Sequence, residues 1–212
     1  MSDPQWYAPP GAQESPPAPY GGPGAHAPQA EAAGFWIRAG ARIIDTIFGA
    51  VVGAAGGVIS GVLLAVAAGA GLGVEAGWER RLGGLSFASF AIGAVATILY
   101  HSLAESIGGA TVGKLVCGLR VLREDDTPAS FGATLLRSLG YYIDAFFFGA
   151  VAWSVMSKSP RQQRLGDQWG KTVVVFRSTV PEASVRNPAL GLLAGVLAQG
   201  VVLVIGTVLR AL

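Results

Sequence analysis

Four long apolar segments dominate the pattern of hydrophobic and polar residues along the chain. Residues 46–74 and 82–104 contain no Asp, Glu, Lys or Arg, residues 138–157 contain only Asp144, and residues 188–209 are again uncharged. A helix needs about 20 apolar residues to cross a bilayer. The pattern therefore predicts membrane segments near residues 43–69, 84–104, 135–156 and 189–209.

Small residues recur every four positions in the first apolar segment. Gly49, Gly53, Gly57 and Gly61 would lie on one face of a helix, where they form a groove typical of close helix–helix packing in membranes. Gly191 and Gly195 predict a similar contact in the last segment.

Two short stretches between the later segments have the β-branched character of strands. They are "LRVL" at residues 119–122 and "KTVVVF" at residues 171–176. If they pair, their loops lie on the same side of the membrane, and both loops are rich in Lys and Arg, which favours the cytoplasm. A single span over 135–156 would separate them, so the segment is either a span or a re-entrant hairpin. The N-terminus is expected to be cytoplasmic, with loop 70–83 outside.

Composition supports a membrane protein. Only 13% of the residues are charged and 51% are hydrophobic, whereas soluble proteins carry about 25% charged residues. A net charge of +2, one cysteine and two histidines predict no nucleic-acid partner and no metal site.

The fold class expected is an all-α integral membrane protein with three to four transmembrane helices and a small β element in the loops. Residues 1–34 hold most of the twelve prolines and predict a disordered tail, or alternatively a docking segment for a partner. The membrane domain is expected over 35–177, followed by a linker and an additional helix over 178–212.

Charged residues recur within the apolar segments. Arg38 and Asp45 are seven residues apart, with Arg42 between them, and Arg137 and Asp144 repeat that spacing. The repeat is either a weak internal symmetry of the kind seen in transporters or a coincidence. Carboxylates at membrane depth are costly unless paired, so they indicate a functional site or a structural ion pair. A third set of charged residues follows these two pairs along the chain and consists of Arg161, Arg164 and Asp167.

A glycine cluster, "GGATVGKL" over residues 108–115, has the Gly-x-x-x-x-Gly-Lys spacing of a phosphate-binding loop. Leu115 follows the lysine, where that loop needs a hydroxyl for Mg²⁺, and the cluster follows a membrane helix instead of a buried strand. We therefore expect no nucleotide. The glycines predict a sharp turn at the membrane surface, with Lys114 facing headgroups or an aspartate.

The chain resembles the RDD family of membrane proteins, named for one arginine and two aspartates. The resemblance rests on "FWIRAGARIID", "GGATVGKLVCGLRVL", "LLRSLGYYID" and "RQQRLGDQWGKTVVV", which together cover about residues 35–177. It maps the named positions to Arg38, Asp45 and Asp167, and a Gly-Lys element to Gly113 and Lys114. A transport role, including cation/proton exchange, has been proposed for that family, and the resemblance implies no more.

Two functions are compatible with these patterns. The first is a transporter or ion- or proton-handling protein, with Asp45 as the cation or proton site, Arg38 as its counter-ion and Asp144 as a second site or gate. The second is a membrane scaffold or assembly factor that acts through helix packing and its tail. Neither is an enzyme, and neither needs a cofactor. The expected partners are the lipid bilayer and a second copy of the chain or another membrane protein, in a cell membrane such as the bacterial plasma membrane.

Overall fold

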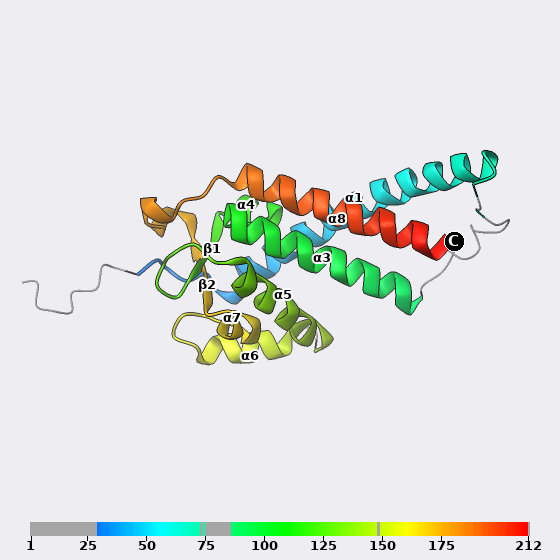
Figure 1. Ribbon diagram of the computed structural model, residues 1–212. Coiled ribbons are helices and arrows are strands. Elements are labelled where there is room, and N and C mark those ends of the chain that lie inside the picture. The colour runs from blue at the N-terminus through cyan, green and yellow to red at the C-terminus, as the bar shows by residue number, and fades with distance from the viewer. Residues whose placement is uncertain (1–28, 73, 75–85, 148, 212) are drawn as a thin grey trace, which may run out of the picture.

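The computed structural model describes residues 29–72, 74, 86–147 and 149–211. The predictions for residues 1–28 and for most of loop 70–83 lie outside these residues. Three long helices form the larger part of the molecule (Figure 1). They are α1 (Phe35–Gly69), α3 (Phe87–Gly108) and α8 (Pro188–Ala211). Each is long and apolar enough to cross a membrane, and they match the first, second and fourth predicted segments.

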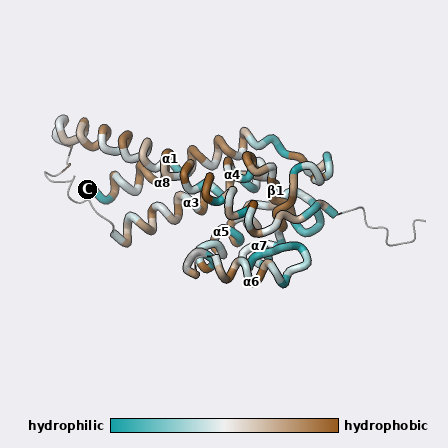
Figure 2. The backbone as a smooth tube through the Cα atoms, turned by 180° about the vertical axis from the view of Figure 1, so that it is seen from behind, coloured by the Kyte–Doolittle hydropathy of each residue, from teal (hydrophilic) through white to brown (hydrophobic). Residues whose placement is uncertain are grey.

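Hydropathy follows this arrangement. Figure 2 shows hydrophobic residues predominating along the three long helices, with hydrophilic residues gathered in the loops around the other end of the molecule. Many large apolar side chains on the long helices are exposed, including Ile43, Val58 and Leu197. Exposed apolar surface over this length suits contact with lipid chains. The chain is therefore a membrane protein built on apolar helices.

Local signals define the ends of α3. The hydroxyl of Ser86 accepts a hydrogen bond from the Ser89 amide at 3.2 Å, which satisfies one of the free N–H groups at the helix start. Gly109 follows the last residue with a φ of 75°, a left-handed conformation that glycine adopts without steric cost. The turn predicted for the glycine cluster is confirmed at this residue.

Two glycines of α8 bring it into close contact with α3. A Cβ on Gly191 would lie 2.5 Å from the backbone N of Gly108, and one on Gly195 would lie 2.8 Å from the carbonyl O of Tyr100. No side chain fits at such distances, so only glycine allows the two backbones to approach this closely. The close packing predicted for Gly191 and Gly195 is confirmed.

The two predicted strands form and pair. Strand β1 (Leu119–Arg123) lies antiparallel to β2 (Thr172–Phe176), with Leu119 opposite Phe176 and Arg123 opposite Thr172. The end of the predicted tail adds to this sheet, because the amide of Ala33 donates to the Val174 carbonyl at 2.8 Å. Ala33 is therefore ordered, although the prediction placed it in the disordered tail.

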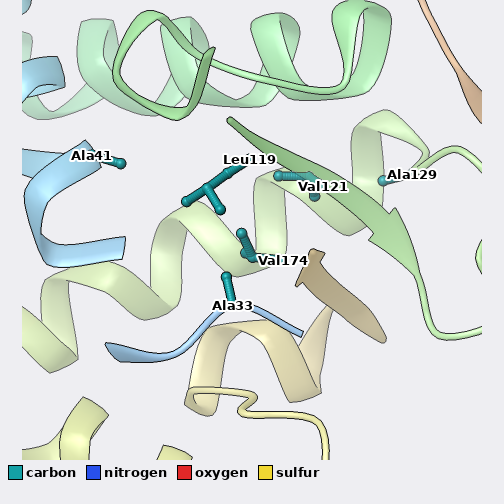
Figure 3. Close-up of a cluster of buried hydrophobic side chains, with 6 residues drawn as sticks. All are labelled: Ala33, Ala41, Leu119, Val121, Ala129 and Val174. Atoms are coloured by element: carbon teal, nitrogen blue, oxygen red, sulfur yellow. The ribbon is translucent and has the colours of Figure 1, made fainter. Parts of the chain in front are cut away.

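A small apolar core lies beneath the sheet. It joins the chain entering α1 to both strands (Figure 3). The buried side chains of this core are Ala33, Ala41, Leu119, Val121, Ala129 and Val174. It fixes the start of α1 against the sheet and so sets the position of the charged residues on the first turns of α1.

The third predicted segment does not form one helix. It is divided into α5 (Phe131–Phe146) and α6 (Ala150–Lys158), which have 16 and 9 residues. Gly149, with a φ of 79°, lies at the break. Because β1 precedes α5 and β2 follows α6, and the strands pair, the segment returns to the end of the molecule where it began. The segment is therefore a helical hairpin, which is the shape that the re-entrant alternative requires, and the number of membrane spans stays a prediction.

Short elements complete the chain at the sheet end. They are α4 (Val112–Val116), α7 (Leu165–Trp169) and the 3-10 turns η1 (Arg177–Thr179) and η2 (Glu182–Ser184). Helix α4 contacts α1, and α7 contacts α5. These contacts bring residues from distant parts of the sequence onto the membrane helices.

Candidate functional site

Asp167 is the centre of a buried charge cluster. Its side chain is fully buried and forms an ion pair with Arg38 of α1. Arg137 of α5 lies 3.3 Å from its Oδ1, and Arg164 Nε lies 3.5 Å from the same atom. One carboxylate therefore neutralises part of the charge of three guanidinium groups from three segments.

Glycines allow α7 to carry Asp167 to this position. A Cβ on Gly140 would lie 2.4 Å from the Cα of Gly166, and one on Gly166 would lie 2.6 Å from the carbonyl O of Arg137. The backbones of α5 and α7 are thus in direct contact, which puts Asp167 beside Arg137. Burial by itself would raise the pKa of Asp167, but the three guanidinium groups outweigh it and hold the pKa well below its usual range.

Glu105 forms a second centre near the end of α3. Lys114 Nζ lies 2.7 Å from its Oε1, and Arg137 Nη1 lies 3.2 Å from its Oε2. Burial lowers the pKa of the Lys114 ammonium from its ordinary value, and the carboxylate opposes that shift. Arg137 is 1% exposed and joins the Glu105 and Asp167 centres into one network.

Asp45 has a different environment. Its Oδ2 accepts a hydrogen bond from the Thr111 hydroxyl at 2.6 Å, and its Oδ1 accepts one from the Gly113 amide at 2.7 Å. A Cβ on Gly113 would lie 1.9 Å from the Ala41 carbonyl O. The carboxylate thus holds α4 against α1, at a contact that only glycine permits.

Arg42 contacts α3 and α5, whereas Asp45 contacts α4. Its Nη1 is hydrogen-bonded to Nε2 of His101, and its Cζ lies 3.5 Å above the centre of the Tyr141 ring. Among the residues that the structure describes, no carboxylate lies within ion-pair distance of Arg42. In the described part of the chain its guanidinium contacts an aromatic face and a histidine ring nitrogen in place of a carboxylate.

Asp144 is buried near the break between α5 and α6. Arg164 Nη1 lies 3.7 Å from its Oδ2, which is a long ion pair. Neither carboxylate oxygen has a hydrogen-bond partner within the described part of the chain. Asp144 is therefore the least well satisfied acid of the group.

Three cavities adjoin the network. One of about 50 Å³ lies inside it, between Arg42, Glu105, Lys114 and Arg137. A second, of about 430 Å³, lies between α1, α5 and α6 and reaches Asp144. A third, of about 520 Å³, lies between α1, α3, α5 and α8. Arg42 and Tyr141 line all three.

The sequence model of the RDD family matches residues 32–171, which is more than half of the chain. The chain belongs to the RDD family. Comparison with curated proteins and with solved structures gave no match. The matched range contains both centres of the charge network and ends just before β2.

The RDD positions do not form a single triad. Arg38 and Asp167 form an ion pair, whereas Asp45 accepts hydrogen bonds from Thr111 and Gly113 at the start of α4. The two arginines that the repeated spacing singled out, Arg38 and Arg137, converge on Asp167. The aspartates seven residues after these arginines have other partners: Asp45 binds Thr111 and Gly113, and Asp144 lies near Arg164.

Lys114 of the RDD Gly-Lys element binds Glu105, a residue that the sequence reading did not single out. Glu105 directly follows an uncharged run of 82–104, so it reads as the end of a membrane segment. Its position four residues after His101 was the available signal. Within the described ranges, no three His, Cys, Asp or Glu side chains group as metal ligands.

Thr111→Val tests the link between α1 and α4 in this RDD protein. Removing the hydroxyl leaves the buried Asp45 carboxylate without one donor, so we expect the free energy of unfolding to fall by about 1.5–3 kcal/mol. Unfolding of the detergent-solubilised protein measures it. The matched control is Thr46→Val, because the Thr46 hydroxyl is exposed and bonds its own helix. Equal losses in both variants would contradict this role.

Proposed function

We propose that this RDD protein transports a small hydrophilic solute or ion. The observation that carries the proposal is the cavity of about 520 Å³ between α1, α3, α5 and α8, which begins at the charge network. Cavities of this size are typical of ligand sites. Polar groups within a membrane domain are costly and therefore mark functional pathways.

The lining of this cavity supports a path along the helices. On α3 the lining residues recur every four positions, from Ser89 through Gly93 and Thr97 to His101. At 1.5 Å per residue they span roughly 18 Å, which is more than half of a hydrocarbon core of about 30 Å. On α1 the lining includes Arg42, Thr46, Gly49 and Gly53. Two of the glycines predicted to pack helices thus line this cavity.

Gln199 gives the cavity a polar group in the middle of α8. Its side chain is 4% exposed, and its Oε1 has no hydrogen-bond partner among the described residues. An amide without a partner in an apolar environment costs free energy, so the group is best explained by water or a solute in the cavity. This is the role expected of a transport path.

The sheet supports a cytoplasmic N-terminus. Both basic loops lie at the end of the molecule where β1 pairs with β2, and residues entering α1 join that sheet. The positive-inside rule places such an end in the cytoplasm. A single span over 135–156 would put the two basic loops on opposite sides of the membrane, against this rule. A hairpin over 135–156 keeps both loops on the same side and agrees with the rule.

Gly53→Leu tests the transport proposal. The added side chain would enter the cavity, so we expect ion or solute flux in proteoliposomes to fall at least tenfold with little change in folding. Gly57→Leu is the matched control, because Gly57 is on the same helix but does not line the cavity. Loss of flux in Gly57→Leu with normal flux in Gly53→Leu would contradict the path.

The scaffold function remains the second candidate, on one observation. Apart from the chain neighbours and the adjacent backbone of α1, no atom of the described chain lies within 4 Å of a Cβ placed on Gly57 or Gly61, and the neighbouring Val58 and Val62 are exposed. This face suits a second copy of the chain or another membrane protein. The scaffold proposal predicts no flux, with Gly57→Leu reducing the size of the purified assembly.

A further inference from the structure

Arg42 differs from the other cations of the network because no carboxylate among the described residues pairs with it. Every other cation of the network has a carboxylate partner: Arg38 and Arg164 at Asp167, Lys114 at Glu105, and Arg137 at both. Among the residues that the structure describes, the Arg42 guanidinium contacts the Tyr141 ring and the ring nitrogen of His101. Its Nε is buried without a hydrogen-bond partner in the described chain.

The acid nearest along α1 offers no free oxygen to a solute in the large cavity. Asp45 is 3% exposed, and both of its oxygens are engaged by Thr111 and Gly113. The other described residues lining this cavity are uncharged. The charged group that remains able to bind a solute there is therefore Arg42.

We propose that the transported species is a small monovalent anion, held at Arg42 where the three cavities meet. This inference rests on the transport function proposed above. A guanidinium N–H edge binds anions by charge-assisted hydrogen bonds, and stacking on Tyr141 fixes the plane of the group. A cation at the same place would meet the guanidinium charge, and the oxygens of Asp45 are not free to coordinate it.

The junction limits the size of the anion. The cavity inside the network holds about 50 Å³, and on the same measure a cavity of about 10–15 Å³ accepts one water. Chloride or formate fits that space, whereas a phosphorylated metabolite does not. The hydroxyl and amide groups of Thr97 and Gln199 along the larger cavity can donate hydrogen bonds to such an anion.

Chloride and formate efflux from phosphatidylcholine vesicles containing the full-length protein tests the proposal, with sodium and potassium efflux measured in parallel. We expect anion efflux to fall at least tenfold in Arg42→Gln and to be partly retained in Arg42→Lys. Arg123→Gln, at a half-exposed side chain, is the control and should be unchanged. Partial retention in Arg42→Lys shows that the loss in Arg42→Gln is not a folding defect.

Other results would separate this inference from the transport function. Sodium or potassium efflux without anion efflux would overturn the anion while leaving transport in place. Absence of any flux would overturn transport, and chloride-dependent thermal stabilisation in detergent, lost in Arg42→Gln, would then still support the anion site. Absence of that stabilisation as well would overturn it. An Arg42 effect seen only with phosphatidylglycerol in the vesicles would assign the guanidinium to a lipid headgroup and overturn the proposal.

Discussion

Replacing Asp167 with asparagine is expected to lower the free energy of unfolding by about 3–5 kcal/mol, because removing one member of a buried ion pair leaves its partners uncompensated. Three guanidinium groups, those of Arg38, Arg137 and Arg164, share this carboxylate. An asparagine can accept hydrogen bonds from them but carries no charge. We expect little folded protein in the membrane fraction at growth temperature.

Unfolding in detergent, followed by circular dichroism, measures this loss, and Asp125→Asn is the control because Asp125 and its partner Arg123 are both exposed. The control should change stability little. Since the pKa of Asp167 is lowered in the folded state, its contribution is present at neutral pH and is lost as the pH falls below the ordinary carboxyl range. Wild-type stability for Asp167→Asn would refute the central role of this residue.

Gly113→Ala is expected to have the second largest effect. The new Cβ would lie 1.9 Å from the Ala41 carbonyl O and 2.9 Å from Cγ of Asp45, and two backbones that touch cannot give way as a flexible side chain can. Helix α4 must move away from α1, which breaks the hydrogen bond from the Gly113 amide to Asp45. We expect a loss of about 3 kcal/mol or more, at the upper end for overpacking.

Gly132→Ala is the matched control for this change. Gly132 lies in α5, and no atom is found within 4 Å of its added Cβ. Alanine there removes backbone entropy from the unfolded chain and should be neutral or stabilising by up to about 1 kcal/mol. Thermal unfolding of both variants gives the comparison. A Gly113→Ala protein as stable as Gly132→Ala would show that the α1–α4 contact is loose.

Much of the fold could be predicted from the sequence because its signals are local. Uncharged runs predicted α1, α3 and α8, and β-branched residues predicted strands that do pair. Segment 135–156 was ambiguous because its composition suits a span, while the break depends on the left-handed conformation of Gly149. A single glycine in an apolar run gives no warning of such a conformation.

The partners of the charged residues could not be predicted in the same way. Spacing along one helix suggested that Arg38 and Arg42 serve Asp45, but Arg38 binds a residue 129 positions away, and Arg42 stacks on Tyr141. The pairing at Asp167 depends on how closely α5 and α7 pack, through backbone contacts at Gly140 and Gly166. The sequence therefore indicated most of the charged residues of the network, but it did not indicate which of them pair.

The shared carboxylate also sets an order of events during synthesis. Arg38 leaves the ribosome 129 residues before Asp167, which at 5–20 residues per second is roughly 6–26 s. During that interval Arg38 is without this carboxylate partner. The ion pair that joins the beginning of the RDD region to its end can therefore form only after α7 has been made.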